Sequence, residues 1–253
     1  MSFTVCNILG VPINNVNLNE ALGLVLLYLE DNEKKIIFTP NPEFIMNAIN
    51  DKEFMDILNK SNLNIADGIG VVIGARMLGY NIKERVAGFD LVQSLFLNIK
   101  NTDKTVYFLG ASEETVVMAK EMMTKKYKGL KIIGTHNGYF KDEEDNIIID
   151  QINKLSPDLL LVGLGSPRQE KWIYNNKDRL NVKVMIGVGG SFDVMSGNVK
   201  RAPKIFIKLN LEWFYRLITQ PTRFKRMLKL PLFIIEVLKY KIKGGKNERN
   251  IKK

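Results

Sequence analysis

The chain has 253 residues, of which 45% are hydrophobic and 25% charged, a composition typical of a globular protein with a substantial core. Its single cysteine, Cys6, excludes an internal disulfide and a multi-cysteine zinc site, and its single histidine, His136, excludes a multi-histidine metal site. The net charge is +10 at pH 7, no apolar run reaches the roughly 18 residues of a membrane-spanning helix, and the N-terminus lacks a signal-peptide pattern.

The N-terminal part predicts a hairpin, a helix and then a strand. Residues 5–16 contain Gly10-Val11-Pro12, which is typical of a short hairpin or an edge strand. A helix is expected over residues 21–29, and Lys35 to Phe38 read as a strand.

A stiff polar loop follows that strand. In Thr39-Pro40-Asn41-Pro42 the two prolines exclude a regular helix or ladder, so the loop presents the side chains of Thr39 and Asn41. Pro42 suits the first position of a helix, so Asn41 is either the cap of that helix or a ligand contact, and one side chain could serve as both.

Asp67 lies where a short strand, Leu63 to Ile65, gives way to a helix over residues 71–78. Gly68 follows it and allows the backbone to turn. In an open α/β sheet such a junction lies at the edge where ligands bind, and the next helix offers free N–H groups to an anion. The alternative is that Asp67 only caps the helix, and the local pattern does not decide between the two.

Arg85 precedes Gly88 and Asp90, at the expected start of another helix. An arginine in this position could bind a phosphate group through its forked donors. The alternative is an arginine that is simply solvated.

The pattern of strand, glycine or polar turn, and helix repeats about six times. This predicts an α/β fold, Rossmann-like, with a mostly parallel sheet and helices on both faces. The polar turns then gather along one edge, where a nucleotide would bind. The remaining strands are expected at residues 105–109, 130–134, 159–162 and 183–188.

Two glycine-containing turns invite comparison with dinucleotide sites. Gly163-Leu164-Gly165 follows a buried strand and precedes Gln169, and its glycines allow a ligand close to the backbone. Gly163-x-Gly165 lacks the third glycine of the fingerprint, and Gly68-x-Gly70-x-x-x-Gly74 is one residue too long. A dinucleotide-dependent oxidoreductase is therefore the weaker alternative.

The C-terminal part carries all of the excess positive charge. Residues 199–253 hold 16 Lys and Arg against 3 Asp and Glu, whereas residues 1–198 hold 21 against 24. One helix is expected from Arg201 onward, with apolar side chains beside a series spaced by four: Lys204, Lys208, Glu212 and Arg216. Basic residues beside Trp, Phe and Ile favour a helix lying in a membrane surface; docking onto the core and nucleic-acid binding are the alternatives.

The predicted organisation is an α/β catalytic domain over residues 1–198 and a basic, amphipathic, membrane-associating appendage over 199–243. A polar tail over 244–253 is expected to be disordered.

With its motifs assembled, the sequence resembles the WecG/TagA/CpsF family of glycosyltransferases, most closely the TagA branch that makes the teichoic-acid linkage unit. The resemblance rests on Thr39-Pro-Asn41-Pro, Ala66-Asp67-Gly68, Arg85-Val-Ala-Gly88-Phe-Asp90, Gly163-x-Gly165-x-Pro167-x-Gln169-Glu170-x-Trp172 and Gly187-x-Gly189-Gly190-x-Phe192-Asp193.

The resemblance implies inverting transfer of N-acetylmannosamine from UDP-ManNAc to undecaprenyl-diphosphate-linked GlcNAc, without a metal or other cofactor. UDP-ManNAcA or another UDP-sugar is the alternative donor. The implied partners are the UDP-sugar, the lipid-linked acceptor and an anionic membrane surface, with no nucleic acid, and a homo-oligomer stays open. The implied location is cytoplasmic, peripheral on the inner face of the cell membrane, and one cysteine fits a reducing compartment.

The same resemblance assigns the base to Asp67, which would take the proton of the acceptor hydroxyl. No Asp-x-Asp motif is present to hold a metal, so the charge that grows on UDP must be stabilised by protein groups. The residues expected to bind substrate are Thr39, Asn41, Arg85, Gly163, Gly165 and Gln169, with Arg216, Arg223 and Arg226 of the tail reaching the diphosphates.

Overall fold

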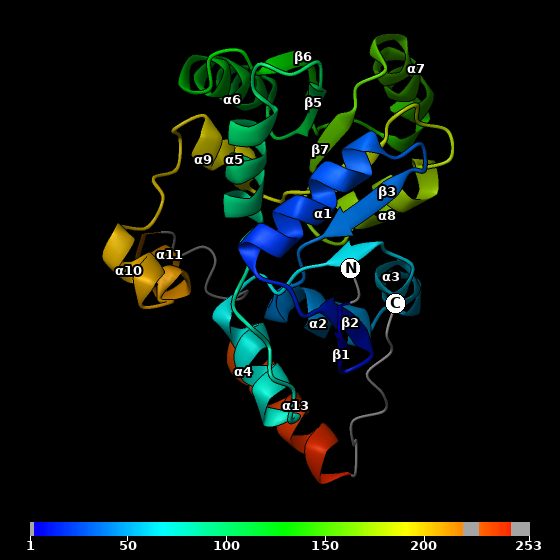
Figure 1. Ribbon diagram of the computed structural model, residues 1–253. Coiled ribbons are helices and arrows are strands. Elements are labelled where there is room, and N and C mark those ends of the chain that lie inside the picture. Colours follow the sequence, from blue (N-terminus) through cyan, green and yellow to red (C-terminus); the bar gives the residue numbers. More distant parts are fainter. Residues whose placement is uncertain (1–2, 220–227, 244–253) are drawn as a thin grey trace. The chain divides into compact units, whose positions relative to one another are not determined.

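The computed structural model describes residues 3–219 and 228–243, and the chain forms an α/β fold with an additional C-terminal helix (Figure 1). Its contacts divide it into two compact units. The first gathers residues 1–17, 39–87 and 201–253, and the second gathers 18–38 and 88–200. These units do not follow the linear boundaries expected from the sequence, because each is assembled from segments that lie far apart in the chain.

The second unit contains five parallel strands in the order β3-β8-β7-β5-β6. Their apolar side chains are almost all buried, as expected for a parallel sheet that is covered on both faces. The predicted parallel α/β sheet is therefore confirmed. The strands are β3 (Lys35–Phe38), β5 (Thr105–Gly110), β6 (Lys131–His136), β7 (Leu159–Gly163) and β8 (Val184–Gly187).

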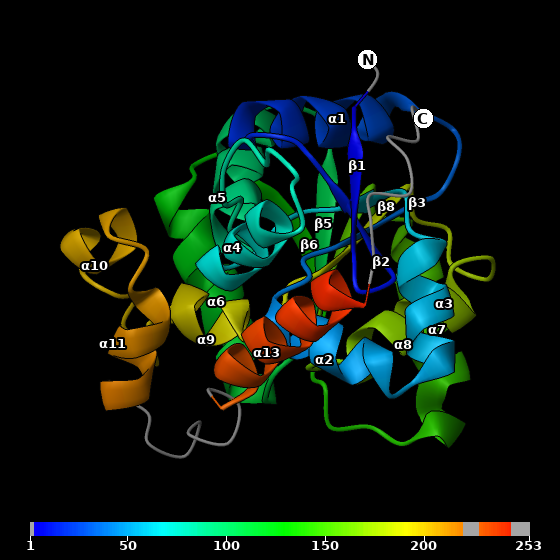
Figure 2. The same cartoon turned by 90° about the horizontal axis from the view of Figure 1, so that it is seen from below.

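Helices cover both faces of this sheet (Figure 2). The connections that contain α5 and α6 cross the sheet in one direction, and those that contain α7 and α8 cross it in the other. Because crossovers between parallel strands are right-handed, α5 and α6 lie on one face of the sheet and α7 and α8 lie on the other. The helices of this unit are α1 (Leu18–Glu30), α5 (Gly88–Ile99), α6 (Glu113–Lys126), η1 (Asp142–Glu144), α7 (Asp145–Leu155), α8 (Arg168–Asn176) and α9 (Ser191–Met195).

The first unit begins with the predicted hairpin, in which β1 and β2 pair antiparallel. Its turn is Leu9-Gly10, and both residues have positive φ angles, of 54° and 93°, which suits a tight two-residue hairpin turn. The elements of this unit are β1 (Val5–Ile8), β2 (Val11–Asn14), α2 (Pro42–Ile49), α3 (Lys52–Asn59), β4 (Leu63–Asn64), α4 (Ile69–Met77), α10 (Lys204–Lys208), α11 (Glu212–Thr219) and α13 (Lys229–Ile242).

Helix α13 packs against α2 and α4, and Figure 1 shows it alongside α4. Two glycines of α4 make room for it: a Cβ placed at Gly70 would lie 2.5 Å from Leu230, and one at Gly74 would lie 2.7 Å from the ring of Phe233. Phe233 and Val237 are fully buried. The docking alternative thus holds for this face of α13, which forms part of the core of the first unit.

The expectation of one continuous helix from Arg201 is wrong. The chain forms α10 and α11 instead, separated at Asn210, whose φ is +59°. Asn210 N–H donates to the Ile207 carbonyl at 3.0 Å and Leu211 N–H to the Phe206 carbonyl at 2.7 Å, which are the two hydrogen bonds of a Schellman motif. Asparagine tolerates the left-handed conformation that this motif requires, and it ends α10 there.

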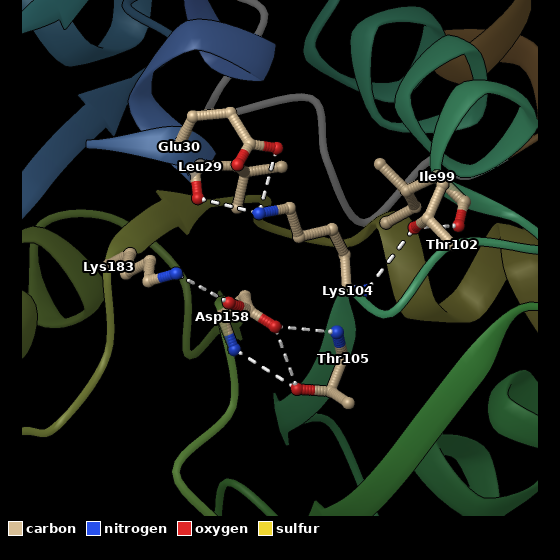
Figure 3. Close-up of polar contacts among 8 residues, drawn as sticks. All are labelled: Leu29, Glu30, Ile99, Thr102, Lys104, Thr105, Asp158 and Lys183. Carbon is tan, nitrogen blue, oxygen red and sulfur yellow. Dashed lines mark hydrogen bonds and ion pairs between the residues drawn. The ribbon is translucent and has the colours of Figure 1, made fainter. Parts of the chain in front are cut away.

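At the amino ends of the parallel strands, Asp158 joins β5 to the segments before β7 and β8 (Figure 3). Its carboxylate accepts from Thr105 N–H at 2.9 Å and lies 3.1 Å from Lys183 Nζ, and Thr105 Oγ1 accepts from Asp158 N–H at 3.2 Å. Burial raises the pKa of Asp158, but the contacts with Thr105 and Lys183 outweigh it and leave the pKa below the ordinary value.

We therefore expect Asp158→Asn to lower the free energy of unfolding by about 1–2 kcal/mol at pH 7, since bonds to an ionised group are lost. A depressed carboxyl pKa stabilises the fold above the unfolded-state pKa, and this contribution is lost as the pH falls through the folded-state value. Urea unfolding should show the difference shrinking as the pH falls below about 4. Asp103→Asn is the matched control, because Asp103 is fully exposed in its pair with Lys131. Equal stability of the Asp158 variant and wild type at pH 7 would contradict this account.

Candidate active site

The loop that carries Asp67 is fixed on both sides within the first unit. Asp67 N–H donates to the Pro40 carbonyl at 3.0 Å, and Val86 N–H donates to the Ala66 carbonyl at 2.9 Å. These two bonds bring together three segments predicted to bind substrate: the Thr39–Asn41 loop, the Asp67 turn and the Arg85 segment. Asp67 itself is partly exposed.

Asp67 is not a helix cap, so that alternative is wrong. The N-cap position of α4 is Gly68, one residue after Asp67, and glycine has no side chain to bond to the first turn. Gly68 has φ +104°, a conformation that a residue with a Cβ rarely adopts, which explains the glycine after the carboxylate. The turn leaves Asp67 immediately before the N-terminus of α4.

Asn41 caps α2, as expected. Its Oδ1 accepts from Phe44 N–H at 3.1 Å, and Pro42 occupies the first helical turn. Thr39 is buried, with 7% of its surface exposed. The cap accounts for the Asn41 side-chain oxygen, and the ligand contact of Asn41 stays a prediction.

Arg85 is held by a carboxylate that the sequence did not suggest. Its guanidinium forms an ion pair with Glu212 of α11, and Arg201 Nε lies 3.6 Å from the other oxygen of the same carboxylate. The Arg85 side chain is only 12% exposed. Arginine has five donors, so a phosphate could share the guanidinium with Glu212 or displace it. The spacing of Lys204, Lys208 and Glu212 predicted that they share one face of a single helix. The chain breaks into two helices at Asn210, so this prediction is wrong.

In the second unit, Gly163 ends β7 in a crowded place. A Cβ there would lie 2.8 Å from the Gly189 carbonyl and 2.8 Å from the ring of Phe192, and Gly163 O accepts from Ala111 N–H at 3.3 Å. Packing between the strand ends therefore requires this glycine. Gly165 differs, because it has φ +78° and open space beside it, where a ligand could approach the backbone.

Gln169 lies in the first turn of α8 and is almost completely buried, with 1% exposed. Its Oε1 accepts from Gly189 N–H at 2.9 Å, and its Nε2 donates to Glu170 Oε1 at 2.5 Å. The structure thus places Gln169 between the turns that follow β7 and β8. Glu170 was not among the residues predicted to act, since a glutamate near a helix start usually indicates a solvated first turn.

Two further side chains of this segment hold the turn after β6. Arg168 donates to the carbonyls of Gly138 and Phe140 at 2.8 and 2.7 Å, and its guanidinium lies 4.7 Å from the centre of the Phe140 ring. Trp172 Nε1 donates to Asp145 at 2.8 Å. Asp145 belongs to the run of four acids from Asp142, and it has this structural role.

One of the three predicted arginines of the tail lies within the described residues. Arg216 lies on α11, and Arg223 and Arg226 fall outside the described residues, as does the polar tail of residues 244–253. Over residues 3–219 and 228–243, no three His, Cys, Asp or Glu side chains gather as metal ligands. Over those same ranges no helix is both long and apolar enough to span a bilayer.

A parallel α/β sheet with glycine and polar turns at its carboxyl edge is typical of the class of enzymes that bind nucleotides at strand ends. The model of the family described as "Glycosyl transferase WecG/TagA/CpsF family" matches residues 6–247 of the chain. The chain belongs to this family.

Three relatives share the name N-acetylglucosaminyldiphosphoundecaprenol N-acetyl-beta-D-mannosaminyltransferase. The one from Bacillus subtilis (strain 168) is 40% identical over 91% of this chain and 90% of its own length. The one from Bacillus spizizenii is 38% identical over 87% and 84%, respectively. The one from Staphylococcus aureus (strain NCTC 8325) is 32% identical over 94% and 93%.

Proposed function

We propose that this protein transfers N-acetylmannosamine from UDP-ManNAc to the GlcNAc of undecaprenyl-diphosphate-GlcNAc, forming a β-1,4 bond in the linkage unit of wall teichoic acid. The observation that carries the proposal is the name shared by relatives that are 32–40% identical over most of the chain. The position of Asp67 adds a chemical reason, because a partly exposed carboxylate is fixed at the end of a strand.

The reaction needs a base. The Asp67 carboxylate takes the proton of the acceptor hydroxyl while that oxygen attacks the anomeric carbon from the face opposite UDP. The bond between the anomeric carbon and the phosphate oxygen breaks, and UDP leaves with the electron pair. Hydrogen bonds to Pro40 and from Val86 hold the strand-end loop in place, so little reorganisation accompanies the step.

The leaving diphosphate needs positive charge or hydrogen-bond donors. In our proposal these come from Arg85, the backbone N–H groups near Gly165 and the tail arginines, without a metal. Arg85 is already positioned by Glu212, and Gly165 has open space beside its backbone.

The lipid acceptor places the reaction at a membrane, and α13 is suited to contact one. Its inner face is docked through Phe233 and Val237. A second apolar stripe is exposed and is spaced by three or four residues. Apolar side chains with lysines nearby fit an anionic membrane surface, so we place the protein on the inner face of the cell membrane. The exposed stripe comprises Leu228, Leu232, Ile235, Leu238 and Ile242, and the nearby lysines are Lys239, Lys241 and Lys243.

The test is a turnover assay of the full chain with a set of UDP-sugars and a lipid-linked GlcNAc acceptor, with and without EDTA. We expect UDP release with UDP-ManNAc, unchanged by the chelator. Turnover with UDP-ManNAcA or another UDP-sugar, and none with UDP-ManNAc, would show that the other sugar is the donor. A rate lost with EDTA and restored by Mg²⁺ or Mn²⁺ would overturn the metal-free reaction. Tight NAD(P) or flavin binding without sugar transfer would indicate the oxidoreductase alternative.

A further inference from the structure

Glu170 is a carboxyl group buried without exposure in the first turn of α8. An ionised carboxylate is costly in such a place. Burial raises the pKa of Glu170 to about 8, although the hydrogen bond from Gln169 and the nearby Ser166 hydroxyl act in the opposite direction. The strands that α8 packs against, β3, β7 and β8, carry one titratable side chain, Lys35, whose ammonium pairs with Asp31 and Glu33.

The orientation of the neighbouring amide is set by the backbone. Gly189 N–H can only donate, so the oxygen of the Gln169 amide must face it and the amide nitrogen must face away. That nitrogen faces Glu170 Oε1, which accepts its hydrogen. A Cβ at Gly187, the last residue of β8, would lie 2.8 Å from the same nitrogen, so the end of β8 packs directly against the Gln169 amide.

The second oxygen of Glu170 supports the uncharged form. Glu170 Oε2 and Ser166 Oγ are both buried, and among the described residues neither has a hydrogen-bond partner. The Ser166 hydroxyl is nevertheless close enough to influence the carboxyl. A proton on Oε2 can be donated to Ser166 Oγ, and one proton then satisfies both atoms.

We propose that uncharged Glu170 is a positioning residue of the donor site, which acts through the Gln169 amide to hold the turn over residues 187–190 in the geometry that binds the diphosphate of the nucleotide sugar. The identity of the ligand rests on the proposed function, whereas the link from Glu170 through Gln169 to Gly189 does not. The turn follows the carboxyl end of β8, the edge where nucleotides bind in open α/β sheets.

The test compares Glu170→Met with Glu170→Gln in the full chain, by hydrogen exchange at Gly189 N–H and by UDP affinity. Methionine fills the space but cannot accept from Gln169, so we expect exchange at Gly189 and the Kd for UDP each to rise about tenfold. Glutamine can accept from Gln169 and donate to Ser166, and it should stay within about twofold of wild type. Above about pH 8, UDP binding should weaken for wild type relative to Glu170→Gln.

Asp158→Asn controls for general destabilisation, since it lies at the opposite ends of the strands and should leave UDP affinity unchanged. Unaltered Gly189 exchange in Glu170→Met would overturn the proposal, and so would faster exchange with unchanged UDP affinity. If wild type binds no UDP but Glu170→Met still frees Gly189 N–H, the proposed function fails and the positioning link stands. If Glu170→Met does not fold, the pH comparison of wild type with Glu170→Gln decides.

Discussion

Asp67→Asn is expected to reduce turnover by about 10²–10⁴-fold, the contribution typical of a positioned base. The substitution keeps the shape of the side chain and removes its ability to take a proton. The backbone bonds that fix the loop, from Asp67 N–H to Pro40 and from Val86 N–H to Ala66, do not involve the side chain and should persist. UDP release in the presence of donor and lipid acceptor measures the effect.

Unchanged circular dichroism and UDP affinity in the same variant would assign the loss to chemistry and not to folding. Retention of more than a few tenths of the wild-type rate would show that Asp67 is not the base. Asp193, at the start of α9 after β8, would then be the next carboxylate to test.

The second large effect is expected on the exposed face of α13. Changing Leu232 and Ile235 together to Glu should weaken binding to vesicles rich in anionic lipid at least about 100-fold. Each side chain is worth roughly 1.5–3 kcal/mol when fully buried, and the added negative charge repels the surface. Both side chains are about half exposed, at 50% and 46%, so the fold should tolerate the change. Vesicle sedimentation at low and high salt is the measurement.

Phe233→Ala, on the opposite face of the same helix, is the matched comparison. It should cost about 3–5 kcal/mol of stability, because a buried aromatic ring is lost from the space beside Gly74, while leaving vesicle binding of the folded protein intact. Vesicle binding that is equal in the double variant and wild type would contradict the membrane role of α13.

Truncation after Gly197 should abolish vesicle binding and most activity, but it would also remove Phe233 and Val237 from the core of the first unit. The α13 surface variant separates these effects. Full activity of that variant on a soluble short-chain acceptor, with loss only on the membrane-bound lipid, would show that the appendage anchors the protein.

Local patterns predicted the parts of this protein that local chemistry controls. The prolines around Asn41 gave the loop and the helix cap, and the recurring turns gave the parallel sheet. What failed depended on contacts distant in sequence. Nothing near Glu212 indicates Arg85 as its partner, and nothing near Glu170 indicates burial, since its neighbours Arg168 and Lys171 suggest a solvated turn.

The break between α10 and α11 has a local signal in the sequence. Asn210 is a residue that readily adopts the left-handed conformation, and it lies two residues after the last residue of the five-residue helix α10. Periodicity of charge alone favoured a continuous helix, and one capping residue outweighed it. The distribution of residues 201–243 into the first unit could not be read from the sequence, because the glycines that receive α13 precede it by more than half of the chain.

The place of α13 in the core has a consequence for synthesis on the ribosome. All segments of the second unit have emerged by residue 200, so that unit can fold while translation continues. The first unit contains residues that emerge early, yet Gly70 and Gly74 are covered only by α13, which is made more than 150 residues later. The apolar surface of α4 beside these glycines therefore stays uncovered until α13 has been synthesised. We expect this half of the nascent protein to be the part that chaperones bind and proteases cut.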